Sequence, residues 1–132
     1  LPLTGTGDET RDFTYVLDLV QGLIKATYYE TAIGQAFNLA SGRETKIKDL
    51  IQMVNTTTGN KTPVSIYPAR KWDTKKRLLA SIELASKLID YKPTTQFEDG
   101  LKANMEWFKK NWEKIQLASD FPVGMSSAIR KR

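Results

Sequence analysis

Residues 5–28 read GTGDETRDFTYVLDLVQGLIKATY and contain the change from a turn to a helix on which the predicted fold rests. Glycine and polar residues fill positions 4–10, a composition that is typical of turns. From Val16 onward, apolar residues recur every three or four positions, which is the spacing of one helix face. That face consists of Val16, Leu19, Val20, Leu23, Ile24 and Thr27. We predict a turn at 4–10, a short strand at 13–16 and a helix at 16–28.

The rest of the chain alternates helices with short apolar runs. Helical spacing of apolar residues recurs in three more segments, residues 46–58, 82–90 and 97–116. Thr45 is expected to cap the helix at 46–58 and Gly59 to end it. Ser81 is expected to cap the helix at 82–90. Short strands are expected at residues 36–39, 64–67 and 78–80. Because so few short strands do not form a self-sufficient sheet, the predicted class is α/β: a mainly helical lobe with a few short strands, part of a larger unit.

The composition excludes several kinds of chemistry. The 132-residue chain contains no cysteine and no histidine. Disulfides, thiolate or imidazole metal sites and a Ser-His-Asp triad are therefore excluded. No apolar run is long enough for a transmembrane helix, and the first residues lack the features of a signal peptide. One domain is expected at this length, and the start without methionine suggests a piece of a longer protein or a processed product.

The formal charge of +5 is concentrated in two clusters. Residues 69–77 contain five basic residues and one acidic residue, and residues 109–132 contain six basic and two acidic residues. Compact clusters of this kind suit a small phosphate-bearing ligand at least as well as a nucleic acid, which usually meets a broader basic stripe. Ordinary solvated surface charge is the competing explanation, and for the tail it is the expected one.

Two stretches carry the candidate site residues. Arg11 lies in a loop just before the first helix, where its guanidinium could meet an anion or form a surface ion pair with Asp12. In the second basic stretch, Arg70, Asp73 and Arg77 could bind phosphate oxygens and sugar hydroxyls. Trp72 could stack on a ligand or pack into the lobe, and we expect it to pack. Gly5-Thr6-Gly7 is expected to be a plain turn, because no strand precedes it and no third glycine or lysine follows at the spacing of a phosphate loop.

Five motifs in this order resemble the extended short-chain dehydrogenase/reductase family, in particular its NAD-dependent nucleotide-sugar epimerases and dehydratases of the UDP-glucose 4-epimerase group. The motifs are Gly5-Thr6-Gly7 through Arg11-Asp12-Phe13-Thr14-Tyr15-Val16 and Asp18, Phe37-Asn38-Leu39-Ala40-Ser41-Gly42, Arg70-Lys71-Trp72-Asp73, Lys87-Leu88-Ile89-Asp90-Tyr91-Lys92-Pro93, and Phe97-Glu98-Asp99-Gly100-Leu101 through Trp107. Ala40 and Asp90 stand where the family usually has glycine.

The resemblance implies roles for individual residues. In such enzymes the arginines that match Arg11 and Arg70 contact the diphosphate of the nucleotide sugar, and the aspartate that matches Asp73 holds the ribose. Arg77 matches more loosely and is assigned only proximity to phosphate. Residues 1–116 would then form the C-terminal substrate-binding lobe, followed by an irregular basic tail at residues 117–132.

The family's dinucleotide loop and its catalytic Tyr-x-x-x-Lys pair are expected upstream of this segment. Tyr67 and Lys71 have the bare spacing of that pair, but Pro68 disfavours the helix on which the pair would lie. The resemblance thus implies no cofactor, metal or catalytic residue on this chain, and NAD in the parent enzyme. The implied partners are a nucleotide sugar, the protein's own N-terminal Rossmann domain and a second copy in a homodimer. The implied location is the cytoplasm, without membrane or nucleic-acid binding.

Two other functions stay open from the residues alone. A basic module could bind nucleic acid through residues 69–77 and 109–132. Alternatively, a helical interaction domain could meet a partner through an exposed apolar face. Binding of oligonucleotides and self-association, respectively, distinguish these functions from nucleotide-sugar binding.

Overall fold

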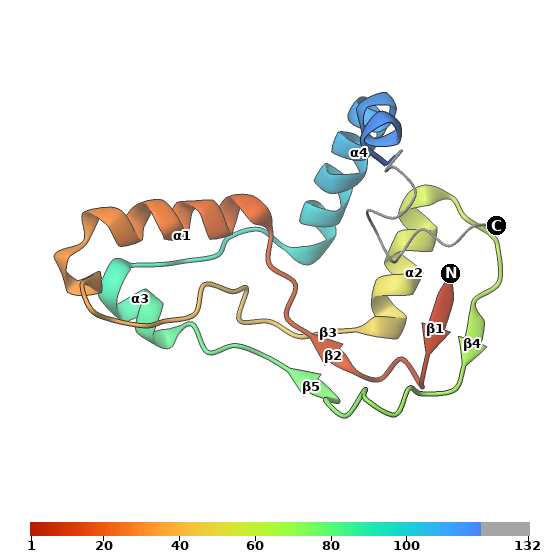
Figure 1. The fold of residues 1–132 in the computed structure, drawn as a ribbon, viewed down its shortest axis with the longest axis horizontal. Helices are drawn as coiled ribbons and strands as arrows, with labels where there is room; N and C mark the ends of the chain where they lie inside the picture. The colour runs from red at the N-terminus through yellow and green to blue at the C-terminus, as the bar shows by residue number, and fades with distance from the viewer. Residues whose placement is uncertain (120–132) are drawn as a thin grey trace. The chain divides into compact units, whose positions relative to one another are not determined.

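The computed structural model describes residues 1–119 of the chain, shown as a ribbon in Figure 1. The chain divides into two units, Leu1–Gly100 and Leu101–Arg132. The first unit contains all strands of the described residues together with helices α1 (Val16–Tyr28), α2 (Ile47–Thr58) and α3 (Glu83–Ile89). Helix α4 (Phe97–Ser119) begins in the first unit and supplies the described part of the second. The predicted α/β class, mainly helical with a few short strands, is confirmed.

The four predicted helices all form, and their ends show where local signals were overruled. Lys46 occupies the cap position of α2 in place of Thr45, and both residues belong to strand β3 (Thr45–Lys46), which pairs with residues 10–11. Gly59 ends α2 as predicted, with a left-handed φ of 67°. Ile82 takes the cap position of α3, while the Ser81 hydroxyl accepts a hydrogen bond from the Glu83 N–H at 3.4 Å.

The boundary of the predicted tail is wrong at its start. Helix α4 continues to Ser119, so residues 117–119 are helical and not irregular. The remainder of the predicted tail, residues 120–132, lies outside the described residues.

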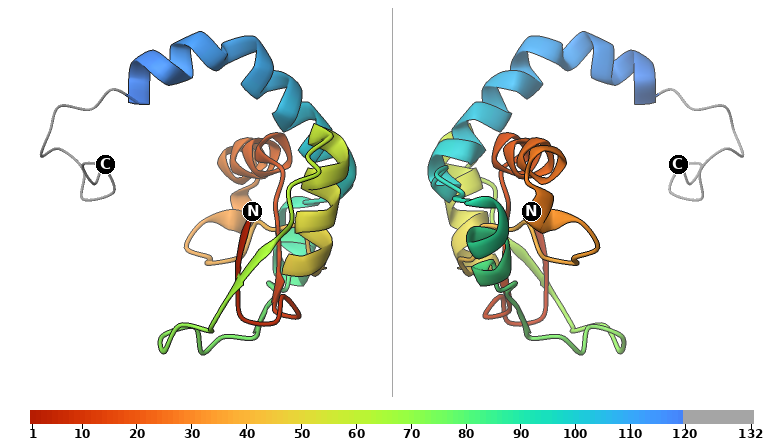
Figure 2. Two further views of the ribbon diagram at one scale, coloured as in Figure 1. Left: turned by 90° about the vertical axis from the view of Figure 1, so that its right-hand side faces the viewer. Right: turned by 90° about the vertical axis from the view of Figure 1, so that its left-hand side faces the viewer.

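The strands form two small sheets in the first unit. Strand β1 (Pro2–Thr4) pairs in parallel with β4 (Ser65–Tyr67), and α2 lies between them in the chain. Strand β2 (Thr10–Arg11) pairs antiparallel with β3 (Thr45–Lys46) and parallel with β5 (Arg77–Leu78). The connection from β4 to β5 runs along the lower edge of the first unit in Figure 1 and in Figure 2. This pairing brings three distant segments to one place in the fold.

Two predicted strands do not form. The strand predicted at 13–16 is absent, and α1 begins at Val16. The Phe13 ring instead packs on the Phe97 ring, with 5.2 Å between the ring centroids. Residues 36–39 have no strand assignment and pair with no strand among residues 1–119, although Phe37 and Leu39 pack against the core. The third strand, predicted at 78–80, is shifted to Arg77–Leu78.

The core of the first unit lies between α1, α3 and residues 36–40. Its fully enclosed side chains are Ala85, Ile89 and Tyr91. The Tyr91 hydroxyl donates a hydrogen bond to the Ala40 carbonyl at 3.1 Å, which satisfies the buried polar end of this ring. A Cβ on Gly22 would lie 2.8 Å from both Leu39 and Tyr91, so α1 reaches the core only with glycine at this position.

The apolar face of α1 points away from this core. The buried residues of α1 are Asp18 and Gly22, whereas Leu23 is 54% exposed. The exposed large apolar residues of the helix are Val16, Leu17, Val20, Leu23, Ile24 and Tyr28. Within residues 1–119, no helix combines the length and apolar character needed to cross a membrane.

Candidate functional site

The connection from β4 to β5 contains a tight turn held by an ion pair. The Asp73 N–H donates to the Arg70 carbonyl at 3.0 Å, which closes the turn over residues 70–73. The Arg70 side chain donates from Nε to Asp73 Oδ2 at 2.6 Å and from Nη2 to Oδ1 at 3.0 Å. This two-point contact orients the carboxylate and the guanidinium of one turn in a common plane.

Arg11 also acts on this carboxylate. The pKa of Asp73 lies below its usual value, chiefly because Arg70 donates hydrogen bonds to it and further because the charges of Arg70 and Arg11 stabilise the anion. Arg11 belongs to β2, and its Nη1 donates to the Thr10 carbonyl at 2.7 Å. Arg70 and Arg11, although far apart in sequence, therefore both stabilise this carboxylate, Arg70 through direct contact and Arg11 through its charge alone.

Trp72 lies at the tip of the same turn and is 73% exposed. The prediction that its indole packs into the lobe is wrong for the described residues. The Arg70 guanidinium carbon lies over the indole, 5.8 Å from the ring centroid, which is within the range of a cation–π contact. The reason is the turn itself, which directs residue 72 outward from the strands that it connects.

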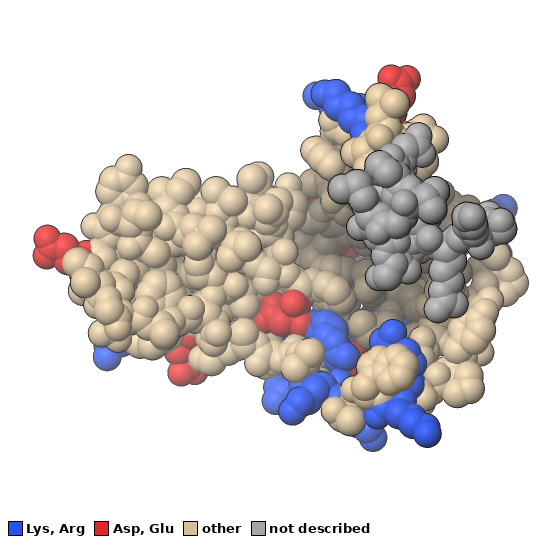
Figure 3. Space-filling view, in the orientation of Figure 1, with Lys and Arg blue, Asp and Glu red and all other residues tan. Residues whose placement is uncertain are grey.

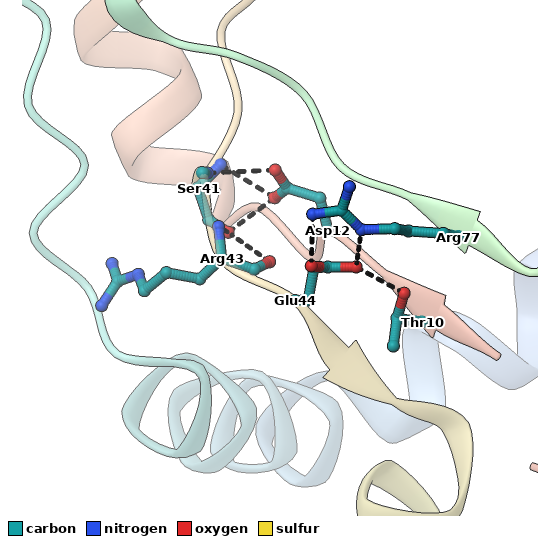
Figure 4. Close-up of polar contacts among 7 residues, drawn as sticks. Thr10, Asp12, Ser41, Arg43, Glu44 and Arg77 are labelled. Carbon is teal, nitrogen blue, oxygen red and sulfur yellow. Dashed lines mark hydrogen bonds and ion pairs between the residues drawn. The ribbon is translucent and has the colours of Figure 1, made fainter. Parts of the chain in front are cut away.

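Arg77 has a different partner, which the sequence did not indicate. Its Nε and Nη2 each donate to the Glu44 carboxylate at 2.8 Å, and the Thr10 hydroxyl donates to the same carboxylate at 2.6 Å (Figure 4). Arg77 and then Thr10 lower the pKa of Glu44 through these bonds. The contact ties β5 to the segment before β3 and takes up one edge of the Arg77 guanidinium.

Asp12 holds the neighbouring loop in place. Its carboxylate accepts hydrogen bonds from the Ser41 N–H at 2.9 Å, the Ser41 hydroxyl at 2.5 Å and the Gly42 N–H at 3.0 Å (Figure 4). Among the described residues, Asp12 thus binds a distant loop and does not form the ion pair with Arg11 that the sequence suggested. Asp12 thereby anchors the residue next to Arg11 in the chain.

Positive side chains gather over the connection from β4 to β5, whereas the surface over α1 is nearly free of charge in the view of Figure 3. The basic residues of this connection and of β5 are Arg70, Lys71, Lys75, Lys76 and Arg77, and all are exposed. The basic cluster at residues 69–77 is therefore a surface feature that includes Asp73, and the charge of Arg11 acts on the same carboxylate. Among residues 1–119, no group of three or more acidic side chains is arranged to hold a metal ion.

The Gly5–Gly7 turn does not fit the phosphates of a dinucleotide. Strand β1 does precede it, contrary to the sequence prediction, but β2 follows where a dinucleotide site needs a helix. The Gly5 N–H donates to the Tyr67 carbonyl at 3.0 Å, and a Cβ on Gly7 would lie 3.1 Å from Leu3 and Lys48. Both glycines thus serve the packing of the chain itself. They are not arranged as a loop for the phosphates of NAD.

A separate cavity of about 160 Å³ lies beside Arg43. Its lining includes Phe13, Ser41, Glu44 and Thr95. The Arg43 guanidinium donates to the Gln96 side-chain oxygen at 2.6 Å and to the Thr95 carbonyl at 3.1 Å. Arg43 therefore holds the segment just before α4 in place. None of the residues that line the cavity belongs to the turn at residues 70–73.

Several known proteins are similar to this chain in sequence and in fold. No protein-family model matches the chain. It is 32% identical over 120 residues to a UDP-glucuronate 4-epimerase of Thermodesulfobacterium geofontis, covering 88% of this chain and 35% of that protein. The structure of the epimerase Mth375 of Methanothermobacter thermautotrophicus superposes with a TM-score of 0.86 at 44% identity, covering 89% of this chain and 35% of the other. The chain is related to the nucleotide-sugar epimerases of the extended short-chain dehydrogenase/reductase family.

A third match is an enzyme whose structure contains two bound ligands. The Bordetella bronchiseptica enzyme WbmF, solved in complex with NAD+ and UDP, matches this epimerase-related chain with a TM-score of 0.74 at 36% identity. The match covers 89% of this chain and 34% of WbmF. The epimerase-related chain thus spans about a third of the length of the proteins that it matches.

Proposed function

We propose that this chain supplies the diphosphate-binding residues of an NAD-dependent enzyme that acts on nucleotide sugars. The observation that carries the proposal is the two-point contact of Arg70 with Asp73 in an exposed basic turn, with Arg11 on the strand that pairs with β5 and adding its charge at the Asp73 carboxylate. Arg70 and Arg11 would contact the diphosphate, and Asp73 would accept from the ribose hydroxyls. Relatives named as UDP-sugar epimerases and a UDP-bound structure support this substrate class.

The ion pair between Arg70 and Asp73 leaves both groups able to bind a ligand. A guanidinium has five N–H donors, and Asp73 takes up one on Nε and one on Nη2. The other donors of Arg70 can therefore reach phosphate oxygens while the pair stays closed. Each carboxylate oxygen of Asp73 likewise keeps a lone pair for a hydroxyl donor.

Arg77 has a smaller part in the proposal. Arg77 uses the same two nitrogens for Glu44 that Arg70 uses for Asp73. Because the family resemblance implies only proximity to phosphate for Arg77, we assign it a contribution to the positive potential near the phosphates. The remaining lysines of the β4–β5 connection add to this potential and raise the local concentration of anionic ligands.

We further infer that the 132 residues alone do not turn over a nucleotide sugar. The Gly5–Gly7 turn does not fit a dinucleotide, and Tyr67, the tyrosine with a lysine four residues later, ends strand β4 before Pro68. The proposal assigns NAD binding and hydride transfer to other parts of a whole enzyme, to which this chain contributes substrate orientation.

Titration of the chain with UDP, followed by NMR, tests the proposal. Arg70→Ala and Arg11→Ala are each expected to weaken UDP binding by about tenfold, since each removes a charge-assisted contact to phosphate. Lys71→Ala removes the same charge from the neighbouring position and is the matched control, with an expected effect of less than about threefold. Arg77→Ala should weaken binding less than Arg70→Ala.

Equal effects of Lys71→Ala and Arg70→Ala would contradict the proposed contact and leave only nonspecific charge. Tighter binding of a single-stranded oligonucleotide than of UDP, with a steep dependence on salt, would instead favour the nucleic-acid module. Turnover of a UDP-sugar by the chain alone with added NAD would contradict the inferred division of roles.

A further inference from the structure

We propose that Trp72 is the stacking platform for the nucleobase of the bound nucleotide. The proposal rests on the diphosphate site proposed above and extends it by one residue and one part of the ligand. It begins from an anomaly: a tryptophan side chain that is 73% exposed in a turn of charged residues. Such an indole gains little from packing in the described unit, whereas its flat apolar face suits a base.

The turn fixes the backbone of residue 72 relative to the ion pair, and the Arg70 guanidinium contacts its indole. The Asp73 N–H donates to the Arg70 carbonyl at 3.0 Å, and the Thr74 N–H donates to the Trp72 carbonyl at 2.9 Å. Trp72 is thus held between the two residues whose side chains form the ion pair. A platform that is ordered before the ligand arrives loses less conformational entropy on binding.

The chemistry of the turn follows the chemistry of a nucleotide. Arg70 suits the phosphates, Asp73 suits the ribose hydroxyls, and Trp72 supplies the aromatic surface that a base needs. The Arg70 guanidinium lies over one face of the indole, 5.8 Å from its centroid, while the ring remains largely exposed. The other face is accordingly available to a base, and the nearby cation holds the ring in position.

The same turn favours a nucleoside diphosphate over a nucleic acid strand. The Asp73 carboxylate is ionised at neutral pH, because Arg70 holds its pKa below the usual value. A carboxylate next to the platform accepts hydrogen bonds from the two free ribose hydroxyls of a nucleoside diphosphate, whereas the 3′-oxygen of a nucleotide inside a strand is esterified and has no hydrogen to donate. Stacking itself discriminates weakly among bases, so this platform selects for a base and not for a particular one.

The test compares UDP with inorganic pyrophosphate, which shares the phosphates and lacks the base. For Trp72→Ala, we expect UDP binding to weaken by about tenfold and pyrophosphate binding to remain unchanged. Trp72→Phe should restore most of the UDP affinity, because a phenyl ring still stacks. Trp112→Ala removes another exposed indole, from α4, and is the matched control with no expected effect on either ligand.

NMR of the indole N–H groups adds a direct readout. The chain has three tryptophans, and the resonance that Trp72→Phe removes identifies Trp72. That resonance should shift on addition of UDP and much less on addition of pyrophosphate. Circular dichroism of each variant verifies that the fold is retained, which is expected because the replaced side chain is exposed.

The outcomes separate this inference from the proposed function. If Trp72→Ala leaves the affinity for UDP unchanged while Arg70→Ala weakens it, the platform is wrong and the diphosphate site stands. If neither UDP nor pyrophosphate binds, the diphosphate site itself is wrong. If oligouridylate binds more tightly than UDP through Trp72, the platform serves a nucleic acid and the inference is overturned.

Discussion

At the scale of single residues, the site depends on groups whose partners could be recognised only in part from the chain. Arg70 and Asp73 are three positions apart, so a local turn suffices to pair them. Arg11 adds its charge at the Asp73 carboxylate from β2, whose pairing with β5 no local pattern indicated. Glu44, the partner of Arg77, was missed for the same reason, because 33 residues separate the two.

The ionisation of Asp73 gives a prediction at this scale. Its pKa lies below the usual value, and Arg70→Ala should raise it, because the largest stabilisation of the anion is the Arg70 contact. The pair is fully formed above the ordinary aspartate pKa and is lost as the pH falls through the lowered one. A carbon-13 NMR titration of the Asp73 carboxyl measures this shift, and Lys71→Ala should move it less. An ordinary pKa in the unaltered chain would contradict the arrangement.

At the scale of elements, every predicted helix forms, whereas among the predicted short strands only that at 64–67 forms nearly where it was expected, as β4. Apolar residues at three- and four-residue spacing mark a helix within its own segment, and each predicted helix forms. Strands of two or three residues carry little pattern, and their ladder depends on partners elsewhere in the chain. The run at residues 36–39 has strand-forming residues without a strand partner in the described chain, and it is not a strand there.

Gly22 offers a prediction about how α1 contacts the core. Gly22→Ala should lower the free energy of unfolding by about 1–2 kcal/mol, because the added methyl meets Leu39 and Tyr91 at 2.8 Å and this outweighs the helix propensity of alanine. Urea denaturation followed by circular dichroism measures the change. The neighbouring exposed substitution Gln21→Ala is the control and should change the free energy by less than about 0.5 kcal/mol. A stabilising Gly22→Ala would show that α1 does not approach the core as described.

At the scale of the whole molecule, the chain encloses few apolar side chains and exposes many. Among the described residues, the buried apolar set is limited to Leu3, Ala40, Ala85, Ile89 and Tyr91. The apolar face of α1 is exposed on the first unit, so its periodicity correctly indicated a helix but not which face meets the core. A face of this kind promotes association in water because its burial is favourable.

We therefore expect the chain to self-associate as its concentration rises. Leu23→Glu should weaken this association, because it places a charge in the middle of the exposed apolar face. Gln21→Glu adds the same charge at another exposed position of α1 and should have a smaller effect. Sedimentation velocity over a range of concentrations measures both. A chain that stays monomeric at every concentration would contradict the expectation.

The sequence by itself determined the helices, the fold class and the kinship with nucleotide-sugar epimerases. Each of these depends on spacing within one segment or on a short motif, which the chain carries without reference to its fold. Only the tertiary structure decided that Arg11 lies on a strand paired with β5, that Arg77 binds Glu44 and that Trp72 is exposed. These features depend on strand pairing and on the direction of side chains, which arise when distant segments meet.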